Sequence, residues 1–389
     1  MALKVYSQHH AVVTSKSGIA LKLEGGMKEK GLVYWFQDLC KDYNEIVGKK
    51  CANLGEMFQI GLRIPPGFAL SIELYRKFIR DTGLDKGLER YIKGLGNLNG
   101  AGIKIFEEIS RKLRTMVEQK EMPATVREVI INSYHKLSQT HGKKNMPVSV
   151  RSSGTESRPG MFETYLNVTG ENELIATVKK VWSSSYTPRA LAFKVNKRLP
   201  IMADELGVAI VKMVNARSSG ICFTIDPVTG DNSKIIIEAN WGLGEGVVSG
   251  SESIDAFIVD KNELKIIGSH VGKKSKCVVQ VDNSARWVNV PSNMQNIACL
   301  AMEEVVEIAK TAKSTEEKLG CPQDMEWAFE EGVAFPDNLF WLQTRPAKSA
   351  YSKAHTASSA EVADRITSTF REIDVSKIKG RLKAIKFKF

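Results

Sequence analysis

The sequence has few features that would tie the chain to a membrane, a disulfide framework or a zinc site. Its six cysteines are scattered and form no CxxC pair, which argues against disulfide scaffolds and structural zinc sites and fits a reducing compartment. No apolar run approaches the length that crosses a bilayer. The N-terminal segment MALKVYSQHH lacks the apolar core of a signal peptide. We therefore expect a cytoplasmic protein without a membrane partner.

Two familiar nucleotide-binding motifs are also missing. The glycine-rich stretch WGLGEGVVSG, residues 241–250, contains no GxxxxGK followed by serine or threonine, which argues against a P-loop. It does not match GxGxxG at the start of a helix either, which argues against a Rossmann fold. A nucleotide site in this chain would have to be built in another way.

The charge of the chain is basic, with a net charge of +11. Lysine and arginine are spread along the sequence except at its end, KIKGRLKAIKFKF, where basic and apolar residues alternate. Anionic ligands such as nucleotides, or an acidic partner protein, account for the charge as well as nucleic acid does. We interpret the alternating end as a docking strand or a tail, and we expect no nucleic-acid partner.

The length of 389 residues is too great for one ordinary hydrophobic core and predicts two or three domains. Helical patterns dominate the first half of the chain, and strand-like apolar runs follow them. We therefore expect an N-terminal extension (1–30), a first lobe (31–200), a second lobe (201–348) and a basic C-terminal tail (349–389).

The second lobe is predicted to be rich in β-structure. Its apolar runs predict strands at residues 206–214, 220–224 and 234–238. A helix is predicted at residues 302–319, where Gly320 would end it.

A lysine pair, Lys49 and Lys50, precedes a predicted helix that Gly61 would end. A lysine at a helix entrance beside glycine can reach an anion that backbone amides hold. Two solvated surface lysines explain the same pattern, so the pair alone does not identify a site.

A strand predicted at residues 148–151 ends in Arg151 and runs into a loop at residues 152–160, which is rich in small and turn-forming residues. A guanidinium followed by exposed backbone N–H groups suits phosphate binding. An ordinary surface loop is the alternative interpretation.

The stretch at residues 323–347 predicts two short strands around a turn at residues 331–338. Side chains alternate between the faces of a strand, so Asp324 and Glu326 share one face of the first strand. Gln343 and Arg345 likewise share one face of the second. The apolar residues predicted on the opposite faces are Met325, Trp327, Phe340 and Leu342.

If this hairpin closes, two carboxylates, an amide and a guanidinium meet on one surface. Carboxylate oxygens hold Mg²⁺ and the planar guanidinium holds phosphate oxygens, so the surface suits a magnesium-bound polyphosphate. Alternating charged and apolar residues also describe an ordinary half-buried hairpin with salt bridges. Spacing alone does not separate these two interpretations.

Five stretches stand in order along the chain: GKKCANLGEM with RIPPGFAL, VSVRSSGTES with RPGMFETYLNV, GICFTIDPVTG, IIIEANWGLGEGVVSG, and QDMEWAF with LFWLQTRPA. Together they resemble the N-terminal nucleotide-binding region of the phosphoenolpyruvate synthase and pyruvate phosphate dikinase family, over residues 30–348. The resemblance implies an α+β chain with an ATP-grasp fold, in which two lobes clamp ATP. It also implies Mg²⁺, or Mn²⁺ in its place, as the metal.

The resemblance assigns roles in the first half of the chain. Lys50 matches the family's phosphate-binding lysine, and Arg151 matches the arginine of its VRSS motif. Both would bind ATP and act in catalysis. Gly160 and Thr164 match positions in the loop over the triphosphate. Val211 stands where the family often has glutamine beside adenine, which removes one side-chain contact.

The resemblance also assigns roles to the hairpin. Glu326 matches the metal-ligand glutamate, with Asp324 as a second metal ligand. Gln343 and Arg345 match the glutamine and arginine of the LQxRP motif, which contact phosphate. Arg345 would be the third catalytic residue of the chain.

One family feature is absent. Relatives carry a phosphorylated histidine in a GGxxSHAA-like motif, followed by a barrel that binds pyruvate. None of the six histidines of this sequence stands in such a motif; they are His9, His10, His135, His141, His270 and His355. We therefore expect a separate partner subunit that carries the histidine and the acceptor site.

Among split members of the family, phenylphosphate synthase is similar in organisation. This similarity predicts the ATP-binding subunit of a dikinase whose partner passes the phosphoryl group from its histidine to phenol, releasing AMP and phosphate. The alternatives are the ATP-binding half of a pyruvate- or antibiotic-directed water dikinase and a nucleotide-sensing subunit without turnover.

Overall fold

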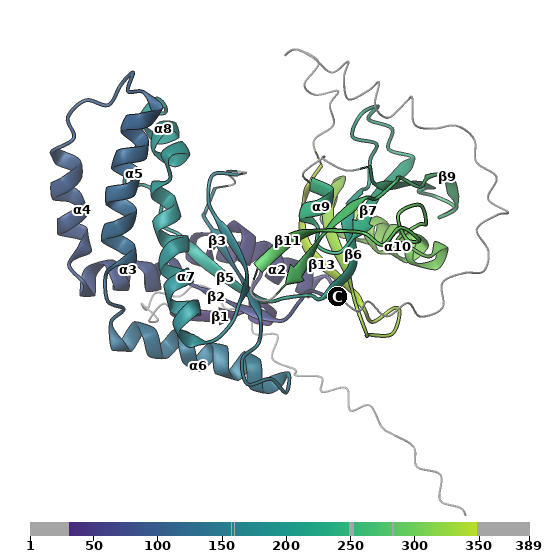
Figure 1. The fold of residues 1–389 in the computed structure, drawn as a ribbon, viewed down its shortest axis with the longest axis horizontal. Helices are drawn as coiled ribbons and strands as arrows, with labels where there is room; N and C mark the ends of the chain where they lie inside the picture. Colours follow the sequence, from purple (N-terminus) through teal and green to yellow (C-terminus); the bar gives the residue numbers. More distant parts are fainter. Residues whose placement is uncertain (1–30, 157, 159, 249–252, 282–283, 348–389) are drawn as a thin grey trace, which may run out of the picture. The chain divides into compact units, whose positions relative to one another are not determined.

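Two antiparallel sheets and a separate β-hairpin carry the described part of the chain (Figure 1). The structure is a computed structural model that describes residues 31–347 except 157, 159, 249–252 and 282–283. The predicted extension, 1–30, and the predicted basic tail, 349–389, lie outside the described residues. The described elements mix helix and strand and confirm the α+β class.

The strands are β1 (Val33–Trp35), β2 (Gly67–Leu70), β3 (Val148–Ser153), β4 (Thr164–Val168), β5 (Gly207–Lys212), β6 (Ala216–Phe223), β7 (Lys234–Trp241), β8 (Asp255–Asp260), β9 (Ile266–His270), β10 (Lys276–Val281), β11 (Ser284–Asn289), β12 (Gln323–Glu330) and β13 (Leu339–Pro346). The α-helices are α1 (Asn44–Val47), α2 (Lys49–Gln59), α3 (Ile72–Asp81), α4 (Leu84–Lys93), α5 (Ile103–Glu118), α6 (Ala124–Thr140), α7 (Glu171–Ser183), α8 (Pro188–Asn196), α9 (Glu245–Val248) and α10 (Met302–Leu319). Short 3-10 helices are η1 (Phe36–Asp38), η2 (Lys41–Tyr43) and η3 (Ser184–Tyr186).

The first sheet has the strand order β1-β2-β5-β3-β4. Residues of β2 and β5 alternate between its faces. Small residues face α1 and α2: Ala69 and Ala209 pack in the same apolar cluster as α2. A Cβ added to Gly207 would lie 2.3 Å from the carbonyl oxygen of Val47. The two helices therefore pack close to this face, because its side chains are small.

Large side chains fill the other face of the first sheet. Phe68 and Ile210 lie fully buried there, in a cluster that includes residues of α3, α5, α6 and α7. Trp182 of α7 stacks on Phe78 of α3, with ring centroids 5.0 Å apart. Figure 1 shows these helices along one side of the sheet. Their apolar side chains and the large side chains of this face together form one buried core.

The second sheet has the order β13-β12-β6-β7-β8-β9. Helix α10 covers one of its faces, where Ile308 and Ala312 pack in one cluster with Met325 and Trp327. The helix covers the residues predicted from the sequence, and Gly320 ends it with a φ of 73°. The opposite face of the sheet carries polar residues and forms the candidate site.

The first sheet extends past residue 200, where we predicted the boundary between the lobes. β5, which follows this boundary, pairs with β2 and β3 and so belongs to the first sheet. The sequence of an apolar strand does not show which sheet it joins, because that depends on the strands with which it pairs. The lobe boundaries stay predictions.

Helix α2 packs against residues of both sheets. One apolar cluster contains Val211 of β5, Met57 of α2 and Trp327 of β12.

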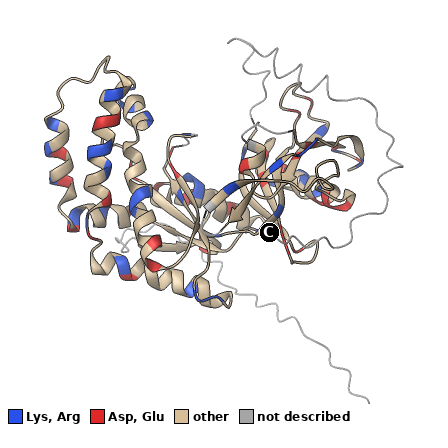
Figure 2. Cartoon of the chain, in the orientation of Figure 1, with Lys and Arg blue, Asp and Glu red and all other residues tan. Residues whose placement is uncertain are grey.

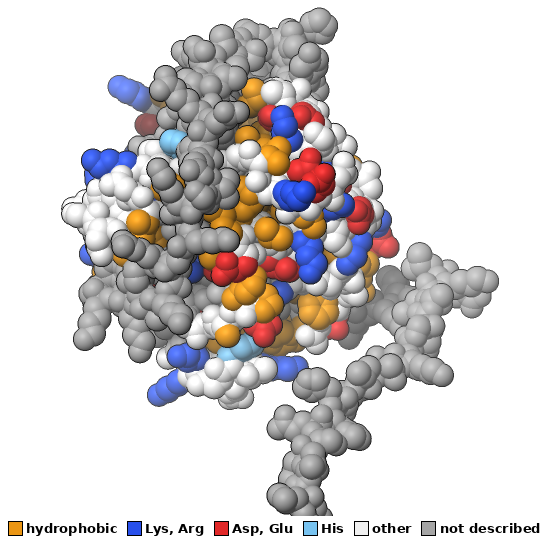
Figure 3. Space-filling view, turned by 90° about the vertical axis from the view of Figure 1, so that its right-hand side faces the viewer, with side chains coloured by type: hydrophobic (Ala, Val, Ile, Leu, Met, Phe, Trp, Pro, Cys, Tyr) orange, Lys and Arg blue, Asp and Glu red, His pale blue; other side chains and the backbone are white. Residues whose placement is uncertain are grey.

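Charges of both signs are distributed over the described residues. Figure 2 shows Lys and Arg on both sheets and on most helices, with Asp and Glu among them. On the face seen in Figure 3, acidic and basic side chains lie side by side with apolar ones between them. No helix among the described residues has both the length and the apolar character needed to cross a membrane.

Candidate nucleotide site

The predicted hairpin forms and brings its four polar residues together. Asp324 lies opposite Arg345, and Glu326 lies opposite Gln343, across strands β12 and β13. Arg345 donates from Nε to Oδ2 of Asp324 at 2.7 Å, and Gln343 donates from Nε2 to Oε1 of Glu326 at 3.3 Å. The turn between the strands covers residues 331–338, as predicted.

The apolar residues of the hairpin divide differently from the prediction. Met325 and Trp327 face the core beneath α10, as expected. Phe340 instead packs with Ala328 and Val214, and Leu342 packs against the same small cluster. The register of β12 and β13 shifts between Glu326 and Trp327, so alternation on one strand no longer matches alternation on the other. The prediction that Phe340 and Leu342 face away from the site is therefore wrong.

Arg151 connects the first sheet to this hairpin. It lies on β3, and its Nη2 donates to Oε1 of Gln343 at 3.2 Å. Its Nη1 donates to the carbonyl oxygen of Leu342 at 3.4 Å. Since Gln343 in turn donates to Glu326, one hydrogen-bonded row runs from Arg151 through Gln343 to Glu326.

Helix α2 presents Lys50 to the same place. Its start is fixed on β3 and the loop after it: Lys49 N–H donates to the carbonyl oxygen of Gly154 at 2.8 Å, and Cys51 N–H donates to Ser153 Oγ at 3.1 Å. Gly48, the N-cap, has a φ of 78°, and a Cβ there would lie 2.0 Å from the carbonyl oxygen of Ser153. Lys49 and Lys50 form the first helical turn rather than preceding the helix, because Gly48 is the cap.

The surroundings of Lys50 perturb its ammonium group. Its pKa falls from 10.5 to about 8, chiefly through burial and then through the nearby positive charge of Arg151. The carboxylate of Glu326 opposes this shift. Two positive groups therefore face each other in a poorly hydrated place, and an anion bound between them would relieve their repulsion.

A cavity of about 270 Å³ lies beside these residues. Arg151 and Thr164, which pair across β3 and β4, line it together with Glu326 of β12. Val211 lines it from β5, at the position predicted beside adenine. The remaining lining is largely apolar and includes Met213, Val214, Ala328 and Leu342. A flat apolar body and a charged end could both be accommodated.

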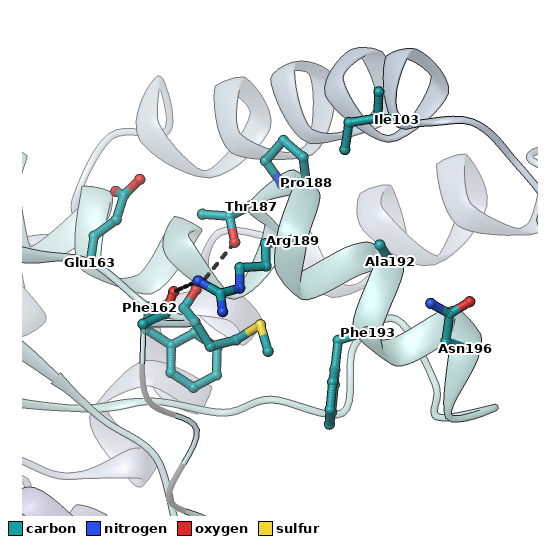
Figure 4. A pocket seen from close by; sticks show the side chains of 11 residues that line it. Ile103, Phe162, Glu163, Thr187, Pro188, Arg189, Ala192, Phe193 and Asn196 are labelled. Atoms are coloured by element: carbon teal, nitrogen blue, oxygen red, sulfur yellow. Dashed lines mark hydrogen bonds between the residues drawn. The ribbon is translucent and has the colours of Figure 1, made fainter. Parts of the chain in front are cut away.

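Gly160 lies elsewhere. It lines a separate, open pocket of about 760 Å³ against α8 (Figure 4). Arg189 donates from Nη1 to the carbonyl oxygen of Gly160 at 3.1 Å, and Thr187 donates from Oγ1 to that of Met161 at 3.3 Å. Of the two loop positions, Thr164 lines the cavity, whereas Gly160 lies against α8 in the other pocket. Contact between Gly160 and a triphosphate stays a prediction.

The sequence interpretation missed several cavity residues. Leu243, Gly244 and Glu245 line the cavity and come from the glycine-rich stretch that matches neither a P-loop nor a Rossmann motif. A Cβ at Gly242 would lie 2.1 Å from the carbonyl oxygen of Val278. That close approach explains the glycine, yet it is invisible without the partner strand.

An ion pair also missed from the sequence stands at the cavity's apolar end. Lys212, the last residue of β5, donates to Oε1 of Glu330, the last residue of β12, at 2.5 Å. Lys212 Nζ also lies 5.3 Å from the ring centroid of Phe340. The pair joins a strand of each sheet and helps to define the cavity wall.

The carboxylates fit a magnesium ion that comes with a polyphosphate. Mg²⁺ is usually held by one or two carboxylates together with phosphate oxygens and water. Among the described residues no group of three or more His, Cys, Asp or Glu could hold a metal by itself. Asp324 and Glu326 are the two carboxylates of the hairpin's polar face, and burial and Asp324 raise the pKa of Glu238 nearby. The face therefore carries negative charge that a cation would stabilise.

Comparison with known proteins gives a consistent result. The family model for the pyruvate phosphate dikinase AMP/ATP-binding domain matches residues 44–366. A probable phosphoenolpyruvate synthase of Methanocaldococcus jannaschii is 36% identical over 321 residues, covering 81% of this chain and 26% of that protein. The phosphoenolpyruvate synthase of Aeropyrum pernix is 34% identical over 349 residues, covering 82% and 42%. That of Pyrococcus furiosus is 30% identical over 374 residues, covering 85% and 45%.

The chain spans less than half the length of these relatives. Among solved structures, the crystal structure of PH1788 from Pyrococcus horikoshii Ot3 aligns with a TM-score of 0.29 and 12% identity, covering 62% of this chain and 99% of that one. This score is too low to support a structural argument.

Proposed function

The chain belongs to the family of pyruvate phosphate dikinase AMP/ATP-binding domains, and we propose that it serves as the ATP-binding subunit of a split dikinase with an ATP-grasp fold. In this proposal it transfers a phosphoryl group from ATP to a histidine on a partner subunit, which then phosphorylates phenol. The balanced reaction is ATP, phenol and water giving phenylphosphate, AMP and phosphate. The observation that carries the proposal is the row from Arg151 through Gln343 to Glu326 beside a cavity.

The triphosphate would lie at the polar end of the cavity. Lys50 and Arg151, which repel each other, would offset negative charge on its oxygens. Arg345 would add a planar fork of donors from β13 once it turns from Asp324. Asp324 and Glu326 would hold Mg²⁺, which when bound neutralises phosphate charge and orients the polyphosphate.

Phosphoryl transfer depends mainly on such positioning and charge stabilisation, so this chain need not supply a general base. Gln343 orients two groups at once, because its amide accepts from Arg151 and donates to Glu326. The apolar end of the cavity, with Val211 and Val214, would take the base of the nucleotide.

The acceptor histidine is proposed to come from outside the described residues. Of the histidines that the structure describes, His135, His141 and His270, none lines the cavity. His135 instead contacts Glu171, and His141 contacts the carbonyl oxygen of Leu137. In the proposal, a histidine of the partner subunit approaches the triphosphate end of the cavity.

A single experiment distinguishes phenol from pyruvate as the phosphoryl acceptor. The chain is incubated with its histidine-bearing partner, radiolabelled ATP and either phenol or pyruvate. AMP formed with phenol supports the proposal. AMP formed with pyruvate but not with phenol would replace it with a pyruvate-directed dikinase, a candidate that the names of the relatives favour. ATP uptake without AMP in any mixture would indicate a nucleotide sensor.

A further inference from the structure

A second group of charged residues lies behind Thr164, outside the cavity. Thr164 begins β4 and lines the cavity, whereas Glu163, directly before it, lines the separate pocket against α8 (Figure 4). Neighbouring residues of an extended chain point to opposite sides. Glu163 therefore holds the backbone of Thr164 from the side away from the nucleotide.

The partner of Glu163 is Arg114 of α5. Arg114 donates from Nη1 and Nη2 to the two oxygens of Glu163, at 2.7 and 2.8 Å. Tyr165 also donates its hydroxyl hydrogen to Glu163. A bidentate guanidinium–carboxylate pair fixes direction as well as distance. The backbone on both sides of Thr164 is thus tied through one carboxylate.

Arg114 is itself held in place. Its Nε donates to Oε1 of Glu118, one turn along α5, at 3.2 Å. Ser183 of α7 donates to the same oxygen at 2.5 Å. Arg114 and Glu163 are about a quarter and a third exposed, so the pair is partly shielded from water. These bonds link two helices to the strand end that faces the nucleotide.

We propose that Arg114 is a positioning residue that, through Glu163, holds Thr164 in place for the triphosphate of ATP. The inference rests on the proposed function of the cavity. Ordering Thr164 before ATP arrives removes an entropic cost from binding, since a free loop end would have to be ordered by the ligand. The effect belongs to the triphosphate and not to the base, because Thr164 pairs with Arg151 at the charged end of the cavity.

The alternative is that Arg114 and Glu163 form an ordinary surface ion pair that only adds stability. The chain offers a matched control for this view. Arg127 of α6 pairs with Glu171 of α7 at 2.9 Å, with side chains 40% and 37% exposed. Neither residue lines the cavity. A purely structural pair and a positioning pair should therefore behave differently when nucleotide binding is measured.

The test compares ATP and AMP binding by calorimetry with excess MgCl₂. Arg114→Met should weaken ATP binding by about tenfold, the size of one lost bond to a charged group, and leave AMP binding within about twofold. Glu163→Gln, which keeps the side-chain shape, should do the same and serves if Arg114→Met folds poorly. Arg127→Met should change neither ligand.

A double variant tests whether the effect passes through Thr164. Thr164→Val should weaken ATP binding, and Thr164→Val with Arg114→Met should weaken it by no more than about another twofold. Three results would overturn this inference without affecting the proposed function. They are equal losses of affinity for ATP and AMP, unchanged ATP binding by Arg114→Met, and additive losses of ATP affinity in the double variant. If the wild-type chain bound no ATP, the proposed function and this inference would both be overturned.

Discussion

Arg345 donates from Nε to Oδ2 of Asp324 at 2.7 Å, and its Nη2 lies 2.7 Å from the same oxygen in an ion pair. The two residues stand directly opposite each other on β13 and β12. Asp324 is largely buried, while half of the Arg345 side chain faces solvent. The Arg345 guanidinium thus pairs with a carboxylate that we propose as a metal ligand. In the proposed function, nucleotide binding redistributes this pair, with Arg345 turning to phosphate and Asp324 to Mg²⁺.

Replacing Arg345 by alanine should therefore separate activity from stability. Phosphoryl transfer to the partner histidine should fall by about 100-fold or more, because a donor aimed at the transferring phosphate is lost. The free energy of unfolding should change by less than about 1 kcal/mol, because a half-exposed ion pair contributes little. Label transfer from radiolabelled ATP and denaturant unfolding measure the two quantities.

The matched control for this variant is Arg63→Ala. Arg63 forms an ion pair with Asp337 at 2.8 Å and has a similar exposure, but Asp337 lies in the turn after β12 and not on the polar face of the hairpin. This control should keep its transfer activity. Undiminished transfer by the Arg345 variant would remove that residue from the reaction.

The depressed pKa of Lys50 predicts how ATP binding depends on pH. Its pKa of about 8 means that the free protein loses the ammonium charge as pH rises through 8. ATP binding should therefore weaken above pH 8, and binding near pH 9 should take up a proton, because phosphate stabilises the ammonium form. Calorimetry in buffers of different ionisation enthalpy measures this uptake.

The lowered pKa of Lys50 also affects stability: ATP binding should weaken as pH rises, whereas the free energy of unfolding should gain from Lys50. The unfolded chain binds this proton up to a pKa near 10.5, so it holds more protons than the folded chain between pH 8 and 10.5. The contribution of Lys50 to the free energy of unfolding should therefore rise with pH across that interval. Lys50→Arg, which stays charged, should lose both effects. Identical proton uptake by wild type and Lys50→Arg would assign the titration to another group.

Replacing Glu326 by glutamine should remove the metal dependence of ATP binding. With excess MgCl₂ the dissociation constant for ATP should rise by about tenfold or more, because a carboxylate ligand is replaced by a weaker amide. In EDTA the variant and the wild type should bind ATP alike. Glu307→Gln, on α10 and outside the cavity lining, is the control and should keep the metal dependence. A variant with a normal magnesium response would place the metal elsewhere.

Gly48 should be essential for the start of α2. Gly48→Ala places a Cβ 2.0 Å from the carbonyl oxygen of Ser153, at a backbone φ of 78°. We expect a loss of about 2 kcal/mol or more in the free energy of unfolding, together with weaker ATP binding as Lys50 moves. Gly320→Ala has a similar φ of 73° and open space around it. It should cost about 1 kcal/mol and leave ATP binding unchanged. Equal effects of the two variants, measured by urea unfolding, would contradict the close contact.

The hairpin was the most predictable part of the site. The alternation of polar and apolar residues was enough to predict that Asp324, Glu326, Gln343 and Arg345 share one surface, and the structure pairs them across the two strands. The bulge between Glu326 and Trp327 was not predictable, because one extra residue in a pairing leaves no mark on composition. It turned Phe340 and Leu342 toward the site side of the sheet.

Long-range convergence could not be read from the residues alone. Lys50 and Arg151 each suggested an anion site locally, but the distance between them in sequence carries no information about pairing. Only the family resemblance placed them together, and the close packing of Gly48 on β3 gives the physical reason. Lys212 and Glu245 were missed for the same reason, because no sequence motif around either residue indicates which distant residues it lies beside.

The most direct test of the account is ATP binding by the wild-type chain, measured by calorimetry with MgCl₂ and again with EDTA. We expect the chain to bind a single ATP, with an affinity that magnesium raises by about tenfold or more. Lys50→Met combined with Arg151→Met should abolish this binding without unfolding the chain. Absence of ATP uptake, or equal affinity with and without magnesium, would contradict a magnesium–triphosphate site between these strands.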